Sequence, residues 1–375
     1  MDNRMRENEI PQGHETVEML TEHFRMDPEL ERGLVDLESR IDPDVEDQIL
    51  AEYRTFLDGN WPDPVFLPTR RKAAASGFTW PDVRVNAALN DFNQMAFQQF
   101  GACSRTLENG IGPLAIRSNY GVCISSAWFG CTVRLMDDDY NCLPTSLPMG
   151  GRHRIDDCVA AGVPDVTTGY GARVFGMGRL FRTLMEPYPR IRRYVHVYHP
   201  DFQSPIDTCE LAWGSDVLLA LYENPDQVHR FLDLVTNTYI DAVRKWSAIH
   251  PFSPDMNAHW NLLHKGCIML RTDSGMNLSP AMYDEFIRPY EQRCLDACGG
   301  GAIHFCGRGD HFIASMTGLR GLTAIHISQP ALNNMEIIYR NTVDRGITLL
   351  NLRLATAMEA LAAGRDLHHR VLGTA

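Results

Sequence analysis

The chain lacks any long apolar run. A membrane-spanning helix needs about 18 or more consecutive apolar residues, and the 375 residues contain no such stretch. The opening residues 1–7 include no apolar segment of the kind found in secretory signal peptides. Low-complexity linkers and repeats of fixed period are also missing. We therefore expect a cytoplasmic protein that contacts no membrane and folds as one large domain.

Cysteine is present, but not in the arrangement of a disulfide framework. The 10 cysteines are scattered along the chain and no secretory signal accompanies them, so we expect reduced thiols. The last of them is Cys306.

Lysine is missing from the first part of the chain. Residues 1–60 contain 17 Asp and Glu against 6 Arg, a net charge of −11 out of −12 for the whole chain. Helical periodicity at 14–25 and 28–57 predicts an acidic helical extension, which we place at residues 1–89. Three interpretations of this extension are open. It packs on the main domain, it packs on a second subunit, or it provides a docking surface for a partner. The acidic balance disfavours nucleic acid as that partner.

From about residue 90 onward, short apolar strands alternate with helices. Strand-like runs lie at 194–199, 267–270, 302–306, 322–327 and 347–350, and helical patterns lie at 213–223, 226–249, 279–298, 309–317, 331–344 and 354–363. Strands this short, separated by helices, are typical of parallel strands joined by right-handed crossovers. We therefore predict an α/β fold with one closed barrel over residues 90–375.

Polar residues recur where these strands end. The carboxyl ends of the strands in a parallel barrel share one face, so the residues there are candidates for a common site. The candidates are Asn119 and Tyr120, His199 and Asp201, Arg271 and Asp273, His304 and Cys306, His326 and Ser328, and Asn351 and Arg353. Each also has a purely structural interpretation: His199-Pro200-Asp201 is compatible with a simple turn, and His326 with a core histidine.

The sharpest local motif is His304-Phe305-Cys306-Gly307. Period-two alternation places the imidazole and the thiol on one face of a strand. Nitrogen and sulfur donors together suit Zn²⁺, and the neighbouring glycines let a ligand approach the backbone. A buried His beside an inert Cys is the alternative, because free Cys is among the most buried residue types.

Several segments resemble the uroporphyrinogen decarboxylase-like superfamily. The resemblance is carried by the run from Ser279 to Tyr290, by His304-Phe305-Cys306-Gly307, and by Asn119-Tyr120-Gly121 and His199-Pro200-Asp201 upstream. Within that superfamily the chain is most similar to the zinc-dependent methyltransferases that work with corrinoid proteins. The resemblance implies a (β/α)₈ TIM barrel with an added N-terminal helical extension, and a homodimer.

Two departures from the family pattern limit what the resemblance implies. Arg70-Arg71 lacks the rest of the arginine motif with which uroporphyrinogen decarboxylases bind substrate carboxylates. The zinc methyltransferases complete their His-x-Cys pair with a distant Cys, whereas no Cys follows Cys306 here. Asp273, His326 and the pair Asp310-His311 are open as the third ligand.

The resemblance implies roles for the candidate residues. His304 and Cys306 bind zinc, and Asp273 orients a ligand or acts as general base. Tyr120 and His199 complete the predicted catalytic set. The predicted substrate-binding residues are Asn119, Arg271, His326 and Arg353. A methyl group then passes between a small-molecule substrate or thiol and a corrinoid that a partner protein carries.

Two other classes of function stay open at this point. One is a decarboxylase or other lyase that acts on a carboxylated small molecule without metal. Its carboxylate-binding groups are arginines near strand ends: Arg117, Arg271, Arg308 and Arg353. The other is a non-catalytic binding protein with the same fold, because fold does not determine function. Metal analysis of protein purified without added metal separates the methyltransferase from both.

Overall fold

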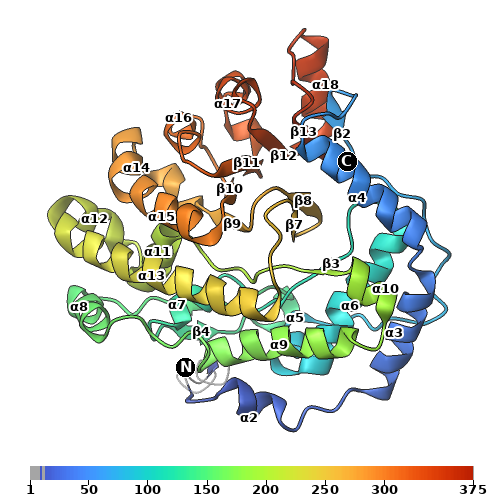
Figure 1. Ribbon diagram of the computed structural model, residues 1–375. Helices are drawn as coiled ribbons and strands as arrows, with labels where there is room; N and C mark the ends of the chain where they lie inside the picture. The colour runs from blue at the N-terminus through green and yellow to red at the C-terminus, as the bar shows by residue number, and fades with distance from the viewer. Residues whose placement is uncertain (1–8, 11–12, 375) are drawn as a thin grey trace.

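A six-stranded parallel sheet is the largest sheet in the computed structural model, which describes residues 9–10 and 13–374; in Figure 1 it runs from the middle of the view to the upper right. Residues 1–8 of the predicted extension lie outside the described residues. From edge to edge the strands are β2 (Val65–Phe66), β13 (Val371–Thr374), β12 (Thr348–Arg353), β11 (Leu322–Ile327), β10 (Gly301–Phe305) and β9 (Ile268–Arg271). Every neighbouring pair is parallel. The predicted α/β class is therefore confirmed.

Three smaller sheets complete the strand inventory of the described residues. A parallel pair joins β3 (Ala115–Ile116) to β6 (His196–Val197), and β7 (Asn257–His259) and β8 (Leu262–His264) form an antiparallel hairpin. An antiparallel sheet contains β1 (Glu9–Ile10), β4 (Thr132–Arg134) and β5 (Thr145–Leu147). No strand ladder among the described residues joins the β3–β6 pair to the large sheet. The closed eight-stranded barrel thus stays a prediction.

Helices lie around the strands in Figure 1. The α-helices are α2 (Val17–Thr21), α3 (Pro28–Arg40), α4 (Pro43–Leu57), α5 (Val85–Asn90), α6 (Phe92–Asn109), α7 (Ile124–Ala127), α8 (Arg152–Ala161), α9 (Tyr170–Met185), α10 (Pro189–Tyr194), α11 (Pro205–Trp213), α12 (Asp216–Glu223), α13 (Pro225–Ile249), α14 (Pro280–Phe286), α15 (Arg288–Cys298), α16 (Ile313–Met316), α17 (Met335–Asn341) and α18 (Leu354–Ala362). Short 3₁₀ helices are η1 (Asp138–Tyr140), η2 (Asp273–Asn277), η3 (Pro330–Leu332) and η4 (Val343–Arg345). Among the described residues, no helix combines the length and apolar character that a bilayer crossing requires.

Proline explains where two predicted helices divide. The predicted helix 28–57 is split because Asp42 accepts a hydrogen bond from the Asp44 N–H and Pro43 opens α4. The predicted helix 279–298 divides at Ile287, just before the first turn of α15, which contains Pro289. Proline has no N–H to donate and disfavours helical conformation in the residue before it, so a new helix begins at each site.

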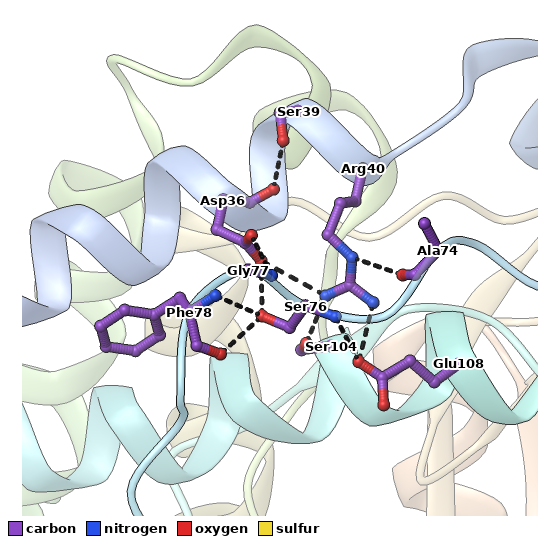
Figure 2. A network of polar contacts seen from close by, with 9 residues as sticks. All are labelled: Asp36, Ser39, Arg40, Ala74, Ser76, Gly77, Phe78, Ser104 and Glu108. Atoms are coloured by element: carbon purple, nitrogen blue, oxygen red, sulfur yellow. Dashed lines mark hydrogen bonds and ion pairs between the residues drawn. The ribbon is translucent and has the colours of Figure 1, made fainter.

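The acidic N-terminal segment is built into the rest of the chain. Arg40, at the end of α3, donates to the carbonyl oxygen of Ala74 at 3.0 Å, to Ser104 Oγ at 2.6 Å and to Glu108 Oε1 at 3.0 Å (Figure 2). Only 7% of its side chain is exposed. Since Ser104 and Glu108 belong to α6, the guanidinium group fastens α3 to the main body.

Segment 1–89 also contributes to the central sheet. Val65 and Phe66 of β2 pair in parallel with Val371 and Leu372 of β13. Phe66 is fully buried and stacks on Phe56 of α4 with ring centroids 4.8 Å apart. The predicted extension is therefore not helical throughout, because it provides an edge strand that the sequence analysis did not identify.

The register of the sheet determines which side chains meet at its centre. His304 of β10 lies beside Arg271 of β9 and beside His326 of β11. Paired residues of neighbouring parallel strands project to the same face. All five residues of β10 are buried, as expected for a parallel strand covered on both faces. The large sheet thus brings three predicted site residues into one row.

Candidate metal centre

Three donor atoms of different chemistry meet where β10 ends. His304 Nε2 lies 3.3 Å from Cys306 Sγ and 3.4 Å from Asp273 Oδ1. The ligand atoms of Asp273, His304 and Cys306 all lie within 4.8 Å of one another. We call these three residues the triad. Nitrogen, sulfur and carboxylate oxygen are the three donor types that zinc uses in proteins.

Backbone hydrogen bonds fix the carboxylate of the triad. Asp273 Oδ1 accepts the N–H of Cys306 at 2.8 Å, which ties η2 to the residue after β10. Asp207 of α11 in turn accepts the N–H groups of Asp273 and Ser274 at 2.9 and 2.8 Å. Three segments that are distant in sequence are therefore held together by the two carboxylates.

A second histidine orients His304. His304 Nδ1 and His326 Nδ1 are 2.7 Å apart, so one ring donates a hydrogen bond to the other. Because His304 Nε2 faces the thiol and Asp273, a metal at Nε2 requires the proton on Nδ1, with His326 as acceptor. This is the second-sphere arrangement that fixes the tautomer of a metal-binding histidine.

The β7–β8 hairpin reaches the same place from the segment before β9. Trp260, at its tip, packs on the rings of His304 and His326, with centroids 5.0 and 4.7 Å away. Its φ of 50° is unusual for a bulky side chain. The strained turn therefore places an indole ring behind the histidine pair.

Burial controls the protonation of the triad in the absence of metal. Loss of solvation lowers the pKa of His304 to about 4, with Asp273 opposing the shift. The imidazole is thus neutral at physiological pH and its Nε2 lone pair is free. Burial, followed by the charge of Asp273, raises the pKa of the Cys306 thiol to about 11. The thiol therefore keeps its proton until a cation replaces it.

Among the residues considered as third ligand, only Asp273 lies in the cluster. His326 directs Nδ1 at His304. Asp310 accepts from Arg308 at 2.7 Å and from the Asn334 N–H at 2.9 Å, and His311 Nε2 lies 2.9 Å from the Leu278 carbonyl oxygen. Of the three alternatives that the sequence analysis left open, Asp273 is the one whose carboxylate lies close to His304 and Cys306.

Arg271 lies next to the triad but is already paired. Its guanidinium group contacts Asp201, which also pairs with Arg117. Arg271 Nη2 lies 2.8 Å from His259 Nε2 as well. Burial opposes the charge on Asp201, yet the two arginines keep its pKa below the ordinary value. Two guanidinium groups thus share one buried carboxylate of the protein itself, and Arg271 Nη1 has no hydrogen-bond partner among the described residues.

The remaining predicted site residues lie apart from the triad. His199 directs Nδ1 at the Pro200 carbonyl oxygen at 2.8 Å and accepts the Met269 N–H on Nε2 at 3.0 Å, so the fold uses both nitrogens. Tyr120 is 1% exposed and packs edge-on against Tyr170. Asn119 Nδ2 lies 3.5 Å from Gln98 Oε1, and Arg353 is exposed at the end of β12. No contact joins these four to the triad within the described part of the chain.

A cavity of about 440 Å³ adjoins the triad through Asp273. Its wall also includes Asp207 and Glu210 of α11, Ser146 of β5, and Gln203. Burial and the nearby charge of Asp273 raise the pKa of Asp207 to about 8. The cavity therefore offers a reactant space beside the triad with acidic groups in its wall.

Asp207 and Trp260 are two residues beside the triad that the sequence analysis missed. Asp207 lies in the first turn of α11, where an acidic residue is ordinarily explained by the helix dipole. Trp260 belongs to a hairpin that precedes β9, whereas the barrel rule selects residues that follow strands. Neither position has a local sequence signal for a site.

Comparisons with known proteins give one informative result. No family model matches the chain, and no curated protein does. A solved structure, a methyltransferase from Methanosarcina mazei, superposes with a TM-score of 0.59 over 87% of this chain and 91% of that one. The two proteins share a fold. Their sequence identity is 15%, so the likeness concerns architecture and leaves the reaction to the site itself.

Proposed function

We propose that the protein is a zinc-dependent methyltransferase, with Asp273, His304 and Cys306 as the metal ligands. The triad carries this proposal, because its N, S and O donors converge within 4.8 Å. The shared fold with a methyltransferase and the resemblance of the His-x-Cys segment support it. The methyl group passes between a small-molecule substrate or thiol and a corrinoid that a partner protein carries.

The residues present fit a catalytic zinc site. Three protein ligands leave one position of a tetrahedral metal open, as in zinc enzymes rather than in closed structural sites. The neutral His304 ring has a lone pair for the metal. The pKa of the Cys306 thiol is about 11 without metal, and a bound divalent cation would displace the thiol proton at neutral pH. When bound, zinc supplies Lewis-acid activation of an acceptor thiol at neutral pH.

The chain's own residues hold the reacting groups in place. His326 accepts a hydrogen bond from the His304 Nδ1–H group and so keeps His304 Nε2 directed at the metal position. Asp207 holds the Asp273 backbone. In the reaction, the acceptor sulfur loses its proton to solvent and donates an electron pair to the methyl carbon. The bond from that carbon to the donor breaks, and its electron pair stays on the donor.

Three further features belong to the proposal. We propose that the six-stranded sheet and the β3–β6 pair are parts of one (β/α)₈ barrel of the uroporphyrinogen decarboxylase-like type. β2 and β13, the first and last of its strands in sequence, already pair. We also propose a cytoplasmic homodimer, which light scattering tests, with a monomer at micromolar concentration as the contrary result.

Metal content and methyl transfer test the central proposal. Wild-type protein purified without added metal should contain zinc in near-stoichiometric amount and transfer methyl groups between methylcobalamin and a thiol. Cys306→Ala should lose both, because two ligands hold zinc poorly. Cys142→Ala is the matched control, since Cys142 is a free, exposed cysteine outside the triad. Wild-type protein that fails to bind zinc, or a Cys306→Ala variant as active as wild type, would refute the proposal.

The lyase alternative gains less support from the site, where the one buried, unpartnered arginine nitrogen among the described candidates is Arg271 Nη1. It needs arginines that are free to bind a substrate carboxylate. Arg117 and Arg271 pair with Asp201, and Arg308 pairs with Asp310. Arg353 is exposed and lies apart from the triad. The methyltransferase is therefore the function that the geometry supports best.

A further inference from the structure

A second cavity, of about 640 Å³, lies beside β6 and apart from the triad. Its wall comes from α4, β6, α10, the ends of α9 and α13, and the segment that leads into β7. We call it the β6 cavity. From its wall we infer that it binds a small anionic amphiphile, a molecule with an apolar chain and a carboxylate head group. This inference goes beyond the proposed function and holds whether or not the triad binds zinc.

The β6 cavity lies where the strands around β6 leave an opening. β6 forms a ladder with β3 and with no other strand of the described residues. On its other side, β7 contacts β6 without forming a ladder. The cavity extends along both strands, from His196 and Val197 to Asn257 and Ala258. An unpaired strand edge is a place where another group can pack or pair, so the fold leaves this edge open to a ligand.

Apolar side chains in the wall keep part of their surface exposed. They come from α4, β6, α13 and the segment before β7, and they are Leu50, Val197, Ile249, Phe252 and Met256. Single exposed apolar residues are ordinary, but apolar groups gathered in a concave site are typical of ligand pockets. The cavity volume lies within the range of small-molecule sites. An alkyl chain bound here would remove this apolar surface from water.

Two guanidinium groups in the wall have no partner within the described part of the chain. Arg54 of α4 and Arg182 of α9 make no ion pair and no side-chain hydrogen bond there. Burial, with the charge of Arg182 adding to it, lowers the pKa of His250, which also lines the cavity. The guanidinium group of Arg182 is therefore close enough to the cavity for its charge to act there.

The other arginines of the wall are already paired. Arg192 pairs with Glu186 at 2.9 Å, and Arg193 pairs with Asp47 at 3.0 Å. Asp255 is an acidic residue of the wall that has no ion pair in the described structure. The unpaired charges of the wall are thus two positive and one negative, in a chain whose net charge is −12. This local excess of positive charge favours an anionic head group over a neutral or cationic one.

A neutral imidazole adds a hydrogen-bonding group to the wall. His196 of β6 lines the cavity, and its ring has no hydrogen-bond partner among the described residues. Burial lowers the pKa of His196 to about 4, so the ring is uncharged at physiological pH and carries one N–H group. Polar groups at such positions are normally satisfied by protein, water or ligand. A bound carboxylate would supply the acceptor for this N–H group.

Calorimetric titration with octanoate, octan-1-ol and octylammonium tests the inference, because the three molecules share a chain and differ in the charge of the head group. Octanoate should bind at least about tenfold more tightly than octan-1-ol, and octylammonium should bind most weakly. Arg54→Gln and Arg182→Gln should each weaken octanoate about fivefold and leave octan-1-ol unchanged. Arg179→Gln is the matched control on α9, because Arg179 is exposed and pairs with Glu18. Met256→Ala should weaken octanoate and octan-1-ol by the same factor, since it removes apolar surface alone.

Two further arms separate the β6 cavity from other sites for a carboxylate. A carboxylate can also bind zinc, so octanoate is titrated into Cys306→Ala, which should bind it as tightly as wild type. Loss of binding in that variant would place the carboxylate at the triad and overturn the inference. Phosphatidylglycerol vesicles distinguish a free amphiphile from a membrane lipid, and the protein should not sediment with them. Sedimentation that requires Arg54 and Arg182, without octanoate binding, would assign these arginines to a membrane surface instead. Equal affinity for the three ligands, or no octanoate binding at millimolar concentration, would also overturn the inference.

Discussion

At the scale of single residues, polar side chains of one type take different roles according to what satisfies them. His199 has both ring nitrogens bonded inside the fold, whereas His304 has one nitrogen on His326 and the other facing the thiol and carboxylate of the triad. Both were strand-end candidates in the sequence, although only His304 belongs to a His-x-Cys motif. Only the three-dimensional partners show which nitrogen is free to bind a metal.

Glu291 gives a prediction about pH that is independent of the triad's own ligands. Its carboxyl is fully buried, and the hydroxyls of Thr272 and Tyr283 donate to it. Burial outweighs these hydrogen bonds and raises the pKa of Glu291 from 4.5 to about 7. Between these values the native protein binds more protons than the unfolded chain, so stability must fall as pH rises.

We expect this group to contribute up to roughly 3 kcal/mol to stability below about pH 4.5, and to lose that contribution as pH rises through about 7. Glu291→Gln removes the titration while it keeps a polar group opposite both hydroxyls. The free energy of unfolding in urea at pH 5 and pH 8 should therefore fall more for wild type than for Glu291→Gln. An identical pH slope in the two proteins would contradict the assignment.

At the scale of elements, one arginine joins α3 to the main body of the protein. Arg40 ends α3, and its guanidinium group is surrounded by acceptors from the 74–78 loop and α6 (Figure 2). Charge patterning identified α3 as acidic and amphipathic. The charge pattern did not show that Arg40, one of the few basic residues in this segment, is buried and contacts the 74–78 loop and α6.

Arg40→Met should destabilise the protein by about 2 kcal/mol, because the change removes a largely buried guanidinium group and leaves the buried Ser104 hydroxyl and the partly exposed Glu108 carboxylate without their donor. Arg32→Met is the matched control on the same helix, since Arg32 pairs with Glu29 at the surface, where side-chain exposures are 69% and 57%. An exposed pair of this kind contributes about 0.5 kcal/mol. Chemical denaturation measures both, and equal losses would show that Arg40 is not the fastening residue.

Elements also show what sequence periodicity detects and what it overlooks. β10 and β11 were predictable because each is a short apolar run between helices, and α13 because its apolar stripe continues over 25 residues. β2 has two residues, too few for any period, and its pairing with β13 spans most of the chain. The β7–β8 hairpin was missed for a related reason, since its strands have three residues each and the barrel rule considers only residues that follow strands.

At the scale of the whole molecule, the triad joins segments that only the fold brings together. The His304–Cys306 spacing was readable because it is local. Asp273 was selected by its place after a strand, and the parallel register of β9 and β10 brings it close to His304 and Cys306. Tyr120, His199, Asn119 and Arg353 were selected by the same rule, which indicates a face of the fold but not which side chains are buried or already bonded.

Because the triad ties η2 to the end of β10, metal should stabilise the whole protein. Ligands that bind only the native state add about 4 kcal/mol when their free concentration is about a thousandfold above Kd. Zinc added to the metal-free protein should raise the thermal unfolding midpoint, and a chelator should reverse the change. Cys306→Ala and His304→Ala should not respond, whereas Cys142→Ala should respond like wild type. A Cys306→Ala variant that zinc stabilises as much as wild type would show that the metal binds elsewhere, because the remaining His304 and Asp273 donors cannot hold it with the same affinity.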